Sequence, residues 1–217
     1  VYGSVIEPSE CLTRLIGQAN SMLWIGLHPK EMGQVINRIG RFYLECARAE
    51  LEAGKGQLDG FLIWGDVAYA KGTFVAPYYW REYVKPWVAE MTAAAHEHGL
   101  PVIYHGCGNV NEIFEDFIEI GVDALNPLEV KAGHDVVDLR RRYGHRMAFC
   151  GNGDVRLWET GDIEAVRDEV LRKLNAARGG GLIFQSDHSV SSEVAGETYD
   201  KVVKTVREYG SYPIELG

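Results

Sequence analysis

The stretch Gly99-Leu-Pro-Val-Ile-Tyr-His-Gly-Cys-Gly-Asn109 (GLPVIYHGCGN) contains the pattern from which the fold class is inferred. A glycine of the kind that stops helices precedes a short β-branched and aromatic run, and the run ends in ligand-type side chains set between glycines. In an extended strand, residues i and i+2 point to the same side. We therefore expect His105 and Cys107 to direct a nitrogen and a sulfur toward a common point.

The same succession of strand, turn and helix recurs from about residue 58 onward. Strands that alternate with helices predict a parallel sheet with right-handed crossovers, and strands that are apolar along their whole length predict burial on both faces. The predicted strands are 1–6, 61–64, 101–104, 122–125, 147–149 and 182–184, and the predicted helices are 9–23, 29–53, 77–98, 110–120, 135–143, 162–177 and 193–209.

Six such strands with polar residues at their carboxyl ends favour a (β/α)8 TIM barrel, in which active sites form at that end. No Gly-x-Gly-x-x-Gly or Walker sequence follows a strand, so a nucleotide-binding sheet gains no support. We expect residues 1–217 to form a single α/β domain that lacks the N-terminal strands and comprises about two thirds of such a barrel. The strand-like run at Val1, without an initiator methionine, suggests that the chain starts inside that domain.

The composition narrows the class of protein. A formal net charge of −9 without a basic stripe argues against a nucleic-acid partner. No apolar run approaches the roughly 20 residues that cross a bilayer, and no signal-peptide pattern is present, so we expect no membrane partner and a cytoplasmic protein. Four cysteines in 217 residues do not indicate a disulfide framework. The oligomeric state is left open, with a homodimer as one option.

Side chains able to bind metals or substrates follow most of the predicted strands. Carboxyl ends of parallel strands meet at one edge, so we expect these side chains to gather there. Histidine, cysteine and glutamate together suit a zinc site with one position open for substrate. The residues concerned are Asp66, His105, Cys107, Asn126, Glu129, Cys150, Asn152, Asp154, Asp187 and His188, and Tyr69 and Tyr104 are candidates for stacking on an aromatic substrate.

A plainer interpretation stays open for several of these residues. Strands end in loops, where polar residues are common, and Asp66 or Asn126 could cap the following helix. Asp154 could form a turn. A single His-x-Cys is a weak signal by itself, and the metal hypothesis gains its support from ligand-type side chains falling at the same end of several strands.

Five blocks in order give the chain a family resemblance: FLIWGDVAYAKG, AAHEHGLPVIYHGCGNV, IGVDALNPLE, CGNGDV and GGGLIFQSDHSV. Together they resemble the uroporphyrinogen decarboxylase superfamily, and specifically its corrinoid-dependent methyltransferase branch. The resemblance implies a (β/α)8 barrel and two chemistries. The decarboxylases act without metal and lack the His-x-Cys pair, whereas the methyltransferases hold zinc through that pair and a third ligand, usually cysteine.

The resemblance assigns metal ligands to four positions in this sequence. His105 and Cys107 match the His-x-Cys pair. The third ligand falls at residues 186–188, which contain no cysteine, so His188 is the first choice and Asp187 the fallback. Glu129 matches a carboxylate that takes the fourth position in some relatives when substrate is absent.

By the same resemblance, the expected cofactors are Zn²⁺ and a corrinoid (cobalamin) carried on a partner protein. The expected reaction moves a methyl group between a small substrate and that corrinoid. Replacing a thiolate by neutral imidazole makes zinc more electrophilic, which favours O-demethylation of a methoxylated aromatic over activation of a thiol acceptor. Asp66, Glu129 and Asn126 are then the expected catalytic groups, and Tyr69, Tyr104, Asn152 and Asp154 the substrate-binding ones.

Two alternatives remain. One is a metal-free decarboxylase of the porphyrinogen type, against which the His-x-Cys pair counts. The other is a truncated, non-catalytic barrel, since six of eight strands would leave an open edge.

Overall fold

The computed structural model describes residues 1–144 and 146–216. They form two compact units, residues 1–124 and 125–217, each described here by itself. The expectation of one domain over the whole chain stays a prediction.

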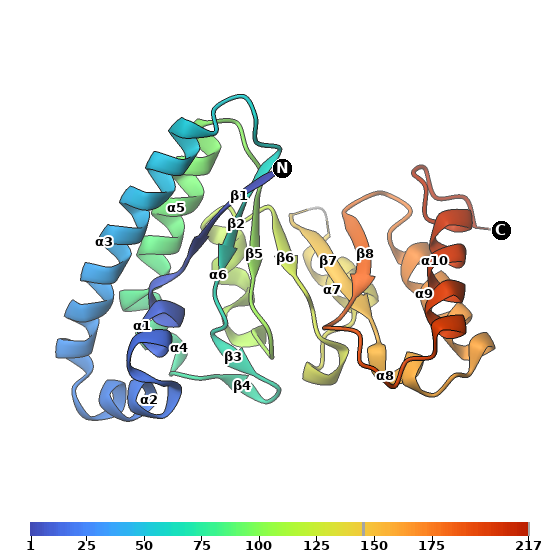
Figure 1. Cartoon of the computed structure of the whole chain (residues 1–217), viewed down its shortest axis with the longest axis horizontal. Coiled ribbons are helices and arrows are strands. Elements are labelled where there is room, and N and C mark those ends of the chain that lie inside the picture. Colours follow the sequence, from blue (N-terminus) through green and yellow to red (C-terminus); the bar gives the residue numbers. More distant parts are fainter. Residues whose placement is uncertain (145, 217) are drawn as a thin grey trace. The chain divides into compact units, whose positions relative to one another are not determined.

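The first unit is a parallel sheet backed by helices. Strands β1 (Tyr2–Ile6), β2 (Gly60–Trp64) and β5 (Val102–His105) lie side by side in that order, all parallel. The other elements are helices α1 (Pro8–Ile16), α2 (Gln18–Leu27), α3 (Pro29–Ala53), α4 (Pro77–Tyr83), α5 (Lys85–Glu97), η1 (Asn111–Ile113) and α6 (Phe114–Glu119), the antiparallel pair β3 (Ala68–Tyr69) and β4 (Gly72–Thr73), and the start of β6 (Ala124–Asn126). Figure 1 shows α3 and α5 running along the same side of this sheet.

The strand register gives the two faces of this sheet different surroundings. Val5, Ile63 and Tyr104 form one row across the three strands, and all three are buried. The next row along the strands points to the opposite face and contains Trp64 and His105, which are partly exposed. The apolar alternate positions therefore make the core beneath the helices, and the other set faces the candidate site.

The second unit repeats the parallel strand and helix pattern. Strands β6, β7 (Ala148–Gly153) and β8 (Leu182–Ser186) follow one another, and β7 pairs with β8 in parallel. Its helices are η2 (Val130–Ala132), α7 (Val136–Tyr143), α8 (Val155–Glu159), α9 (Ile163–Ala176) and α10 (Gly196–Tyr209). Aspartates cap three of these helices: Asp135 for α7, Asp154 for α8 and Asp162 for α9, each accepting a backbone N–H of the first turn.

Two predicted helices are broken, and each break has a local cause. The helix expected over 9–23 ends at Ile16, because Gly17 adopts φ +85 and starts a new direction. The helix expected over 77–98 divides at Val84 into α4 and α5, because Pro86 in the first turn of α5 cannot donate a backbone hydrogen bond. The β3–β4 hairpin and α8 were not predicted, since both are too short to show a periodic pattern.

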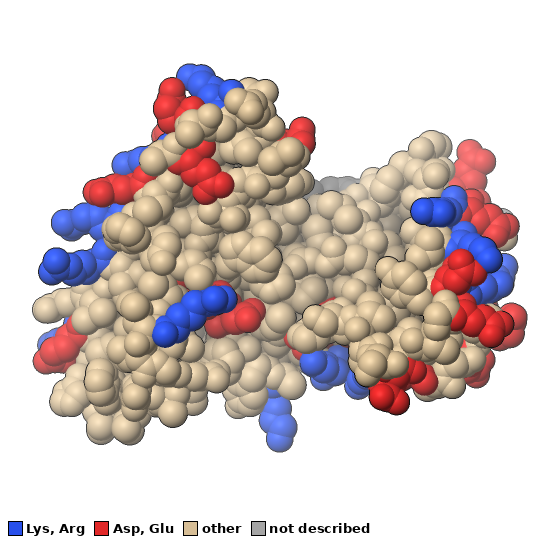
Figure 2. Space-filling view, in the orientation of Figure 1, with Lys and Arg blue, Asp and Glu red and all other residues tan. Residues whose placement is uncertain are grey.

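Figure 2 shows Lys and Arg interspersed with Asp and Glu along the outer side of α3. Among the described helices, none combines the length and apolar character needed to cross a bilayer.

Candidate metal centre at the strand ends

His105 and Cys107 lie at the carboxyl end of β5 with their ligand atoms facing each other. His105 Nε2 is 3.8 Å from Cys107 Sγ, and it is also 3.8 Å from Asp66 Oδ1, which comes from the end of β2. The Cys107 backbone N–H donates to the same Asp66 oxygen at 3.0 Å. The ring of Trp64 lies against the His105 imidazole with 4.8 Å between centroids. Strand alternation therefore brings an imidazole and a thiol to one point, as the sequence predicts.

The glycines on either side of Cys107 allow this loop to approach its neighbours closely. A Cβ on Gly106 would lie 2.7 Å from the Gly65 carbonyl oxygen at the end of β2. A Cβ on Gly108, which has φ +83, would lie 2.6 Å from the Ala68 carbonyl carbon in β3. Side chains at either position would push the His-x-Cys loop away from β2 and the hairpin.

The donor set of Asp66, His105 and Cys107 fits a divalent transition metal. Their ligand atoms all lie within 4.8 Å of one another. A carboxylate oxygen, an imidazole nitrogen and a thiolate sulfur are the three ligand types that proteins offer to zinc. The His105 and Asp66 side chains are 21% and 47% exposed, so the group is open to ligands from outside the sheet.

Two buried glutamates near this group, Glu7 and Glu10, were not predicted from the sequence as site residues. Glu7 directly follows β1, and Glu10 lies in the first turn of α1. Glu7 is fully buried; it caps α1 by accepting the backbone N–H groups of Ser9 and Glu10. Burial raises the pKa of Glu7 to about 7, against the lowering effect of its hydrogen bonds from Ser9 and Glu10. Glu10 accepts the backbone N–H of Asp66 at 3.0 Å. Glu7 directly follows a strand, as several of the predicted site residues do, and this position could have identified it from the sequence.

In the second unit, Glu129 and His188 form the corresponding pair of ligand-type side chains. His188 Nε2 lies 3.9 Å from Glu129 Oε1, while Lys131 Nζ lies 3.2 Å from the other carboxylate oxygen. Glu129 is 3% exposed, whereas the His188 side chain is 44% exposed. The Glu129 carboxylate is therefore buried beside Lys131, whereas the His188 imidazole is accessible.

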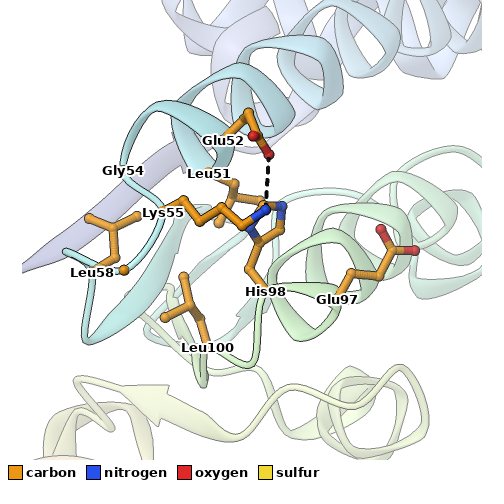
Figure 3. A pocket seen from close by; sticks show the side chains of 9 residues that line it. Leu51, Glu52, Gly54, Lys55, Leu58, Glu97, His98 and Leu100 are labelled. Carbon is orange, nitrogen blue, oxygen red and sulfur yellow. Dashed lines mark ion pairs between the residues drawn. The ribbon is translucent and has the colours of Figure 1, made fainter.

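A hollow of about 400 Å³ in the first unit lies at the wrong end of the strands to be this site (Figure 3). Its lining includes Leu58 and Leu100, which precede β2 and β5, and Lys55 and Glu52, which form an ion pair of 4.0 Å. In barrels of this kind the amino-terminal end of the strands contributes to stability, and the chemistry takes place at the other end.

The sequence of residues 1–209 matches the uroporphyrinogen decarboxylase (URO-D) family. The chain belongs to this family. The resemblance read from the five blocks is thereby confirmed at the level of the family.

Two curated relatives of this URO-D chain are named uroporphyrinogen decarboxylase. The protein from Geobacillus kaustophilus (strain HTA426) is 22% identical over 189 residues, and the one from Geobacillus thermodenitrificans (strain NG80-2) is 22% identical over 184. Each match covers 84% of this chain and 50% of the relative, so the chain spans about half the length of the curated relatives it matches.

A solved structure described as a methyltransferase from Methanosarcina mazei shares the fold. It superposes with a TM-score of 0.74 at 19% identity and covers 97% of this chain and 59% of that chain. The fold class expected from the sequence, a parallel α/β fold of the URO-D type, is therefore confirmed.

The structure assigns several predicted substrate-binding residues of this URO-D chain to structural tasks instead. Tyr104 is fully buried on the face of β5 opposite His105, and its hydroxyl donates to the Gly65 carbonyl at 3.0 Å. Asn152 is also fully buried, and its amide hydrogens go to the carbonyls of Leu128 and His134. Neither side chain offers a surface to a substrate, because strand alternation and burial turn both inward.

Asp154 and Asp187 likewise hold backbone in place. Asp154 caps α8 and pairs with Arg156 at 3.0 Å, which agrees with the plainer interpretation of this residue. Asp187 is 3% exposed, and its two oxygens accept the backbone N–H groups of Val130 and Val155. The fallback ligand Asp187 is thus occupied by backbone donors.

Two other predicted residues keep positions compatible with substrate contact. Tyr69 is 49% exposed on the hairpin and stacks on Phe74 with 5.9 Å between ring centroids. Asn126 ends β6 and is partly exposed. Their contact with a substrate stays a prediction.

Proposed function

We propose that this chain is the catalytic part of a zinc-dependent methyltransferase that moves a methyl group between a small substrate and a corrinoid carried by a partner protein. The favoured substrate is a methoxylated aromatic. The observation that carries the proposal is the His105–Cys107 pair, with 3.8 Å between Nε2 and Sγ at the end of β5. A decarboxylase that works without metal has no use for such a pair.

We assign His105 and Cys107 as two zinc ligands, and the family resemblance assigns His188 and Glu129 as the further ligands. His188 and Glu129 both follow strand ends, and their ligand atoms lie 3.9 Å apart. Burial of the Asp187 carboxylate under two backbone donors supports His188 as the choice within the 186–188 segment. Asp66 adds a carboxylate on the side of β2.

A bound zinc ion would supply Lewis acidity toward the methyl donor, and the partner's reduced corrinoid would accept the methyl group. The chain's own residues prepare the substrate. Trp64 lies against His105 and is 39% exposed, so its ring offers a flat apolar surface beside the ligands. Tyr69 offers a second exposed ring, and Asp66 and Asn126 offer polar atoms that orient the substrate.

A metal-free decarboxylase is the second candidate, and the names of the two Geobacillus relatives favour it. Zinc content separates the two hypotheses. The purified chain should contain stoichiometric zinc by plasma mass spectrometry, and His105→Ala and Cys107→Ala should each remove it. Cys46→Ala is the matched control, because Cys46 is an exposed cysteine on α3. Zinc retained in both site variants, or absent from the unmodified chain, would refute the assignment.

The methyl transfer itself is tested with a Co(I) corrinoid protein and a methoxyarene. We expect the absorption spectrum of methyl-cobalt to appear with the unmodified chain and to be lost with Cys107→Ala. The same mixture with a porphyrinogen should release no carbon dioxide. Carbon dioxide release without methyl-cobalt would favour the decarboxylase.

A further inference from the structure

We propose that Glu10 is a positioning residue that fixes Asp66 and, through it, the His105–Cys107 loop; the consequence for metal affinity rests on the proposed function. Glu10 lies on α1, one turn beyond β1, and is only 7% exposed. A carboxylate this buried needs compensating donors. The groups that donate hydrogen bonds to the Glu10 carboxylate show which part of the structure it positions.

The first connection runs from α1 to the end of β2. Glu10 Oε2 accepts the backbone N–H of Asp66 at 3.0 Å, across 56 residues of sequence. Its other oxygen accepts the Arg14 guanidinium, with Nε at 3.0 Å. Hydrogen bonds to an ionised carboxylate are about twice as strong as neutral ones, so this contact fixes the backbone of Asp66 firmly.

The second connection runs from the end of β2 to the end of β5. Asp66 Oδ1 accepts the Cys107 backbone N–H at 3.0 Å and lies 3.8 Å from His105 Nε2. One carboxylate oxygen therefore contacts both members of the His-x-Cys pair. A displacement of the Asp66 backbone would be passed directly to the loop that carries the thiol.

Glu10 is itself held from behind, which makes the chain of contacts rigid. Its backbone N–H donates to the Glu7 carboxylate at 2.6 Å, and Glu7 is fully buried and donates its own N–H to the Trp64 carbonyl at 2.7 Å. The same two glutamates thus attach α1 to β2 at two neighbouring points. Glutamine in place of Glu10 would keep the volume but bring an amide donor toward either Arg14 or the Asp66 N–H.

The test uses the full chain and two measurements on Glu10→Gln. In the metal-free protein, amide hydrogen exchange should become faster at Asp66 and Cys107 and stay unchanged in the centres of β2 and β5. In a titration with Co²⁺, the dissociation constant should rise about 10-fold, and the thiolate-to-cobalt absorption band should shift. Faster exchange throughout the sheet with the band in place would show only a loss of general stability and would overturn the inference.

Glu50→Gln is the matched control, because Glu50 also accepts a backbone N–H, that of Ser4 in β1, at 3.0 Å and away from the site. It should change neither Co²⁺ affinity nor exchange at Cys107. Arg14→Gln is the second variant if Glu10→Gln does not fold, since the Arg14 side chain is 67% exposed. It should weaken Co²⁺ binding on the order of twofold, in the same direction.

The outcomes separate this inference from the proposed function. Local loss of protection at Asp66 and Cys107 together with weaker Co²⁺ binding supports both. If the unmodified chain binds no Co²⁺, the zinc-based function fails, and the exchange result alone decides whether Glu10 positions the loop. If Glu10→Gln behaves like Glu50→Gln in both measurements, the inference is overturned.

Discussion

Asp66 and Asp187 both follow a strand of a parallel sheet, yet the two units use them in opposite ways. Asp66 lies two residues after β2, its side chain is 47% exposed, and it lies beside an imidazole and a thiol. Asp187 directly follows β8 and is 3% exposed, and its two oxygens accept the backbone N–H groups of Val130 and Val155. The same residue type in the same place is a candidate ligand in one unit and a structural brace in the other.

The difference extends to the neighbouring side chains. Around Asp66 the polar atoms of His105 and Cys107 point toward one another and are partly exposed. Next to Asp187 the second unit buries Asn152, and Cys150 is 2% exposed with burial raising the pKa of its thiol to about 11. An aspartate at a strand end is free to act as a ligand only where the neighbouring backbone N–H groups do not need its oxygens as acceptors.

The strongest destabilisation is expected from a substitution among the buried polar residues of the second unit. Lys173 is 1% exposed and donates to the Glu169 carboxylate and to the Asn152 carbonyl. Lys173→Met should lower the free energy of unfolding by about 4 kcal/mol, because it leaves the Glu169 charge buried without its cationic partner, with only the backbone N–H of Asp154 donating to it. Lys204→Met removes an exposed pair of the same i,i+4 spacing on α10 and should cost below about 1 kcal/mol. Urea unfolding measures both, and equal costs would show that burial is not the cause.

The second test compares the two aspartates directly. Asp187→Ala strands two buried backbone donors and should lower the free energy of unfolding by about 3 kcal/mol. Asp66→Ala removes an acceptor from a loop open to water and should cost less than about 1 kcal/mol, while disturbing Co²⁺ binding. If Asp66→Ala proves the more destabilising of the two in urea, the contrast between ligand and brace is wrong.

The third test concerns Glu7, the buried acid of the first unit. Its folded-state pKa of about 7 lies above the ordinary value of 4.5, so the folded chain binds more protons than the unfolded one between these values. This residue's contribution to stability is therefore greatest below pH 4.5, falls as pH rises to 7, and is level above. The loss should be about 3 to 3.5 kcal/mol, from the difference between 4.5 and 7 at roughly 1.4 kcal/mol per pKa unit. Unfolding measured against pH should show this slope, and Glu7→Gln should flatten it; an unchanged slope would assign the dependence to other groups.

The smallest changes in stability are expected at two glycines, one that the site requires and one that it does not. Gly108→Ala meets the Ala68 backbone at φ +83 and should destabilise by about 2 kcal/mol. Gly26→Ala, in α2 with nothing within 4 Å of the added carbon, should stabilise by about 0.5 kcal/mol. Thermal unfolding reports both, and a Gly108→Ala variant as stable as the unmodified chain would mean that the close approach at Gly108 is not needed.

The sequence was sufficient for the strands and for the pair that carries the proposed chemistry. Apolar runs located all six strands of the parallel fold, because burial selects β-branched and aromatic residues there. The i,i+2 spacing of His105 and Cys107 placed both on one side, because the strand period is two. The same rule, applied to Tyr104, places its ring on the opposite face, and the structure shows it there.

Which polar side chains already have hydrogen-bond partners depends on the tertiary fold. Asn152 and Asp187 look like ligands in the sequence, as His105 and Cys107 do, and their backbone partners lie 16 to 57 residues away. Glu10 likewise looks like an ordinary helix residue until Asp66 is found against it. Periodicity records which way a side chain faces, whereas hydrogen bonding depends on which distant backbone groups the fold brings within reach, and no local pattern encodes that.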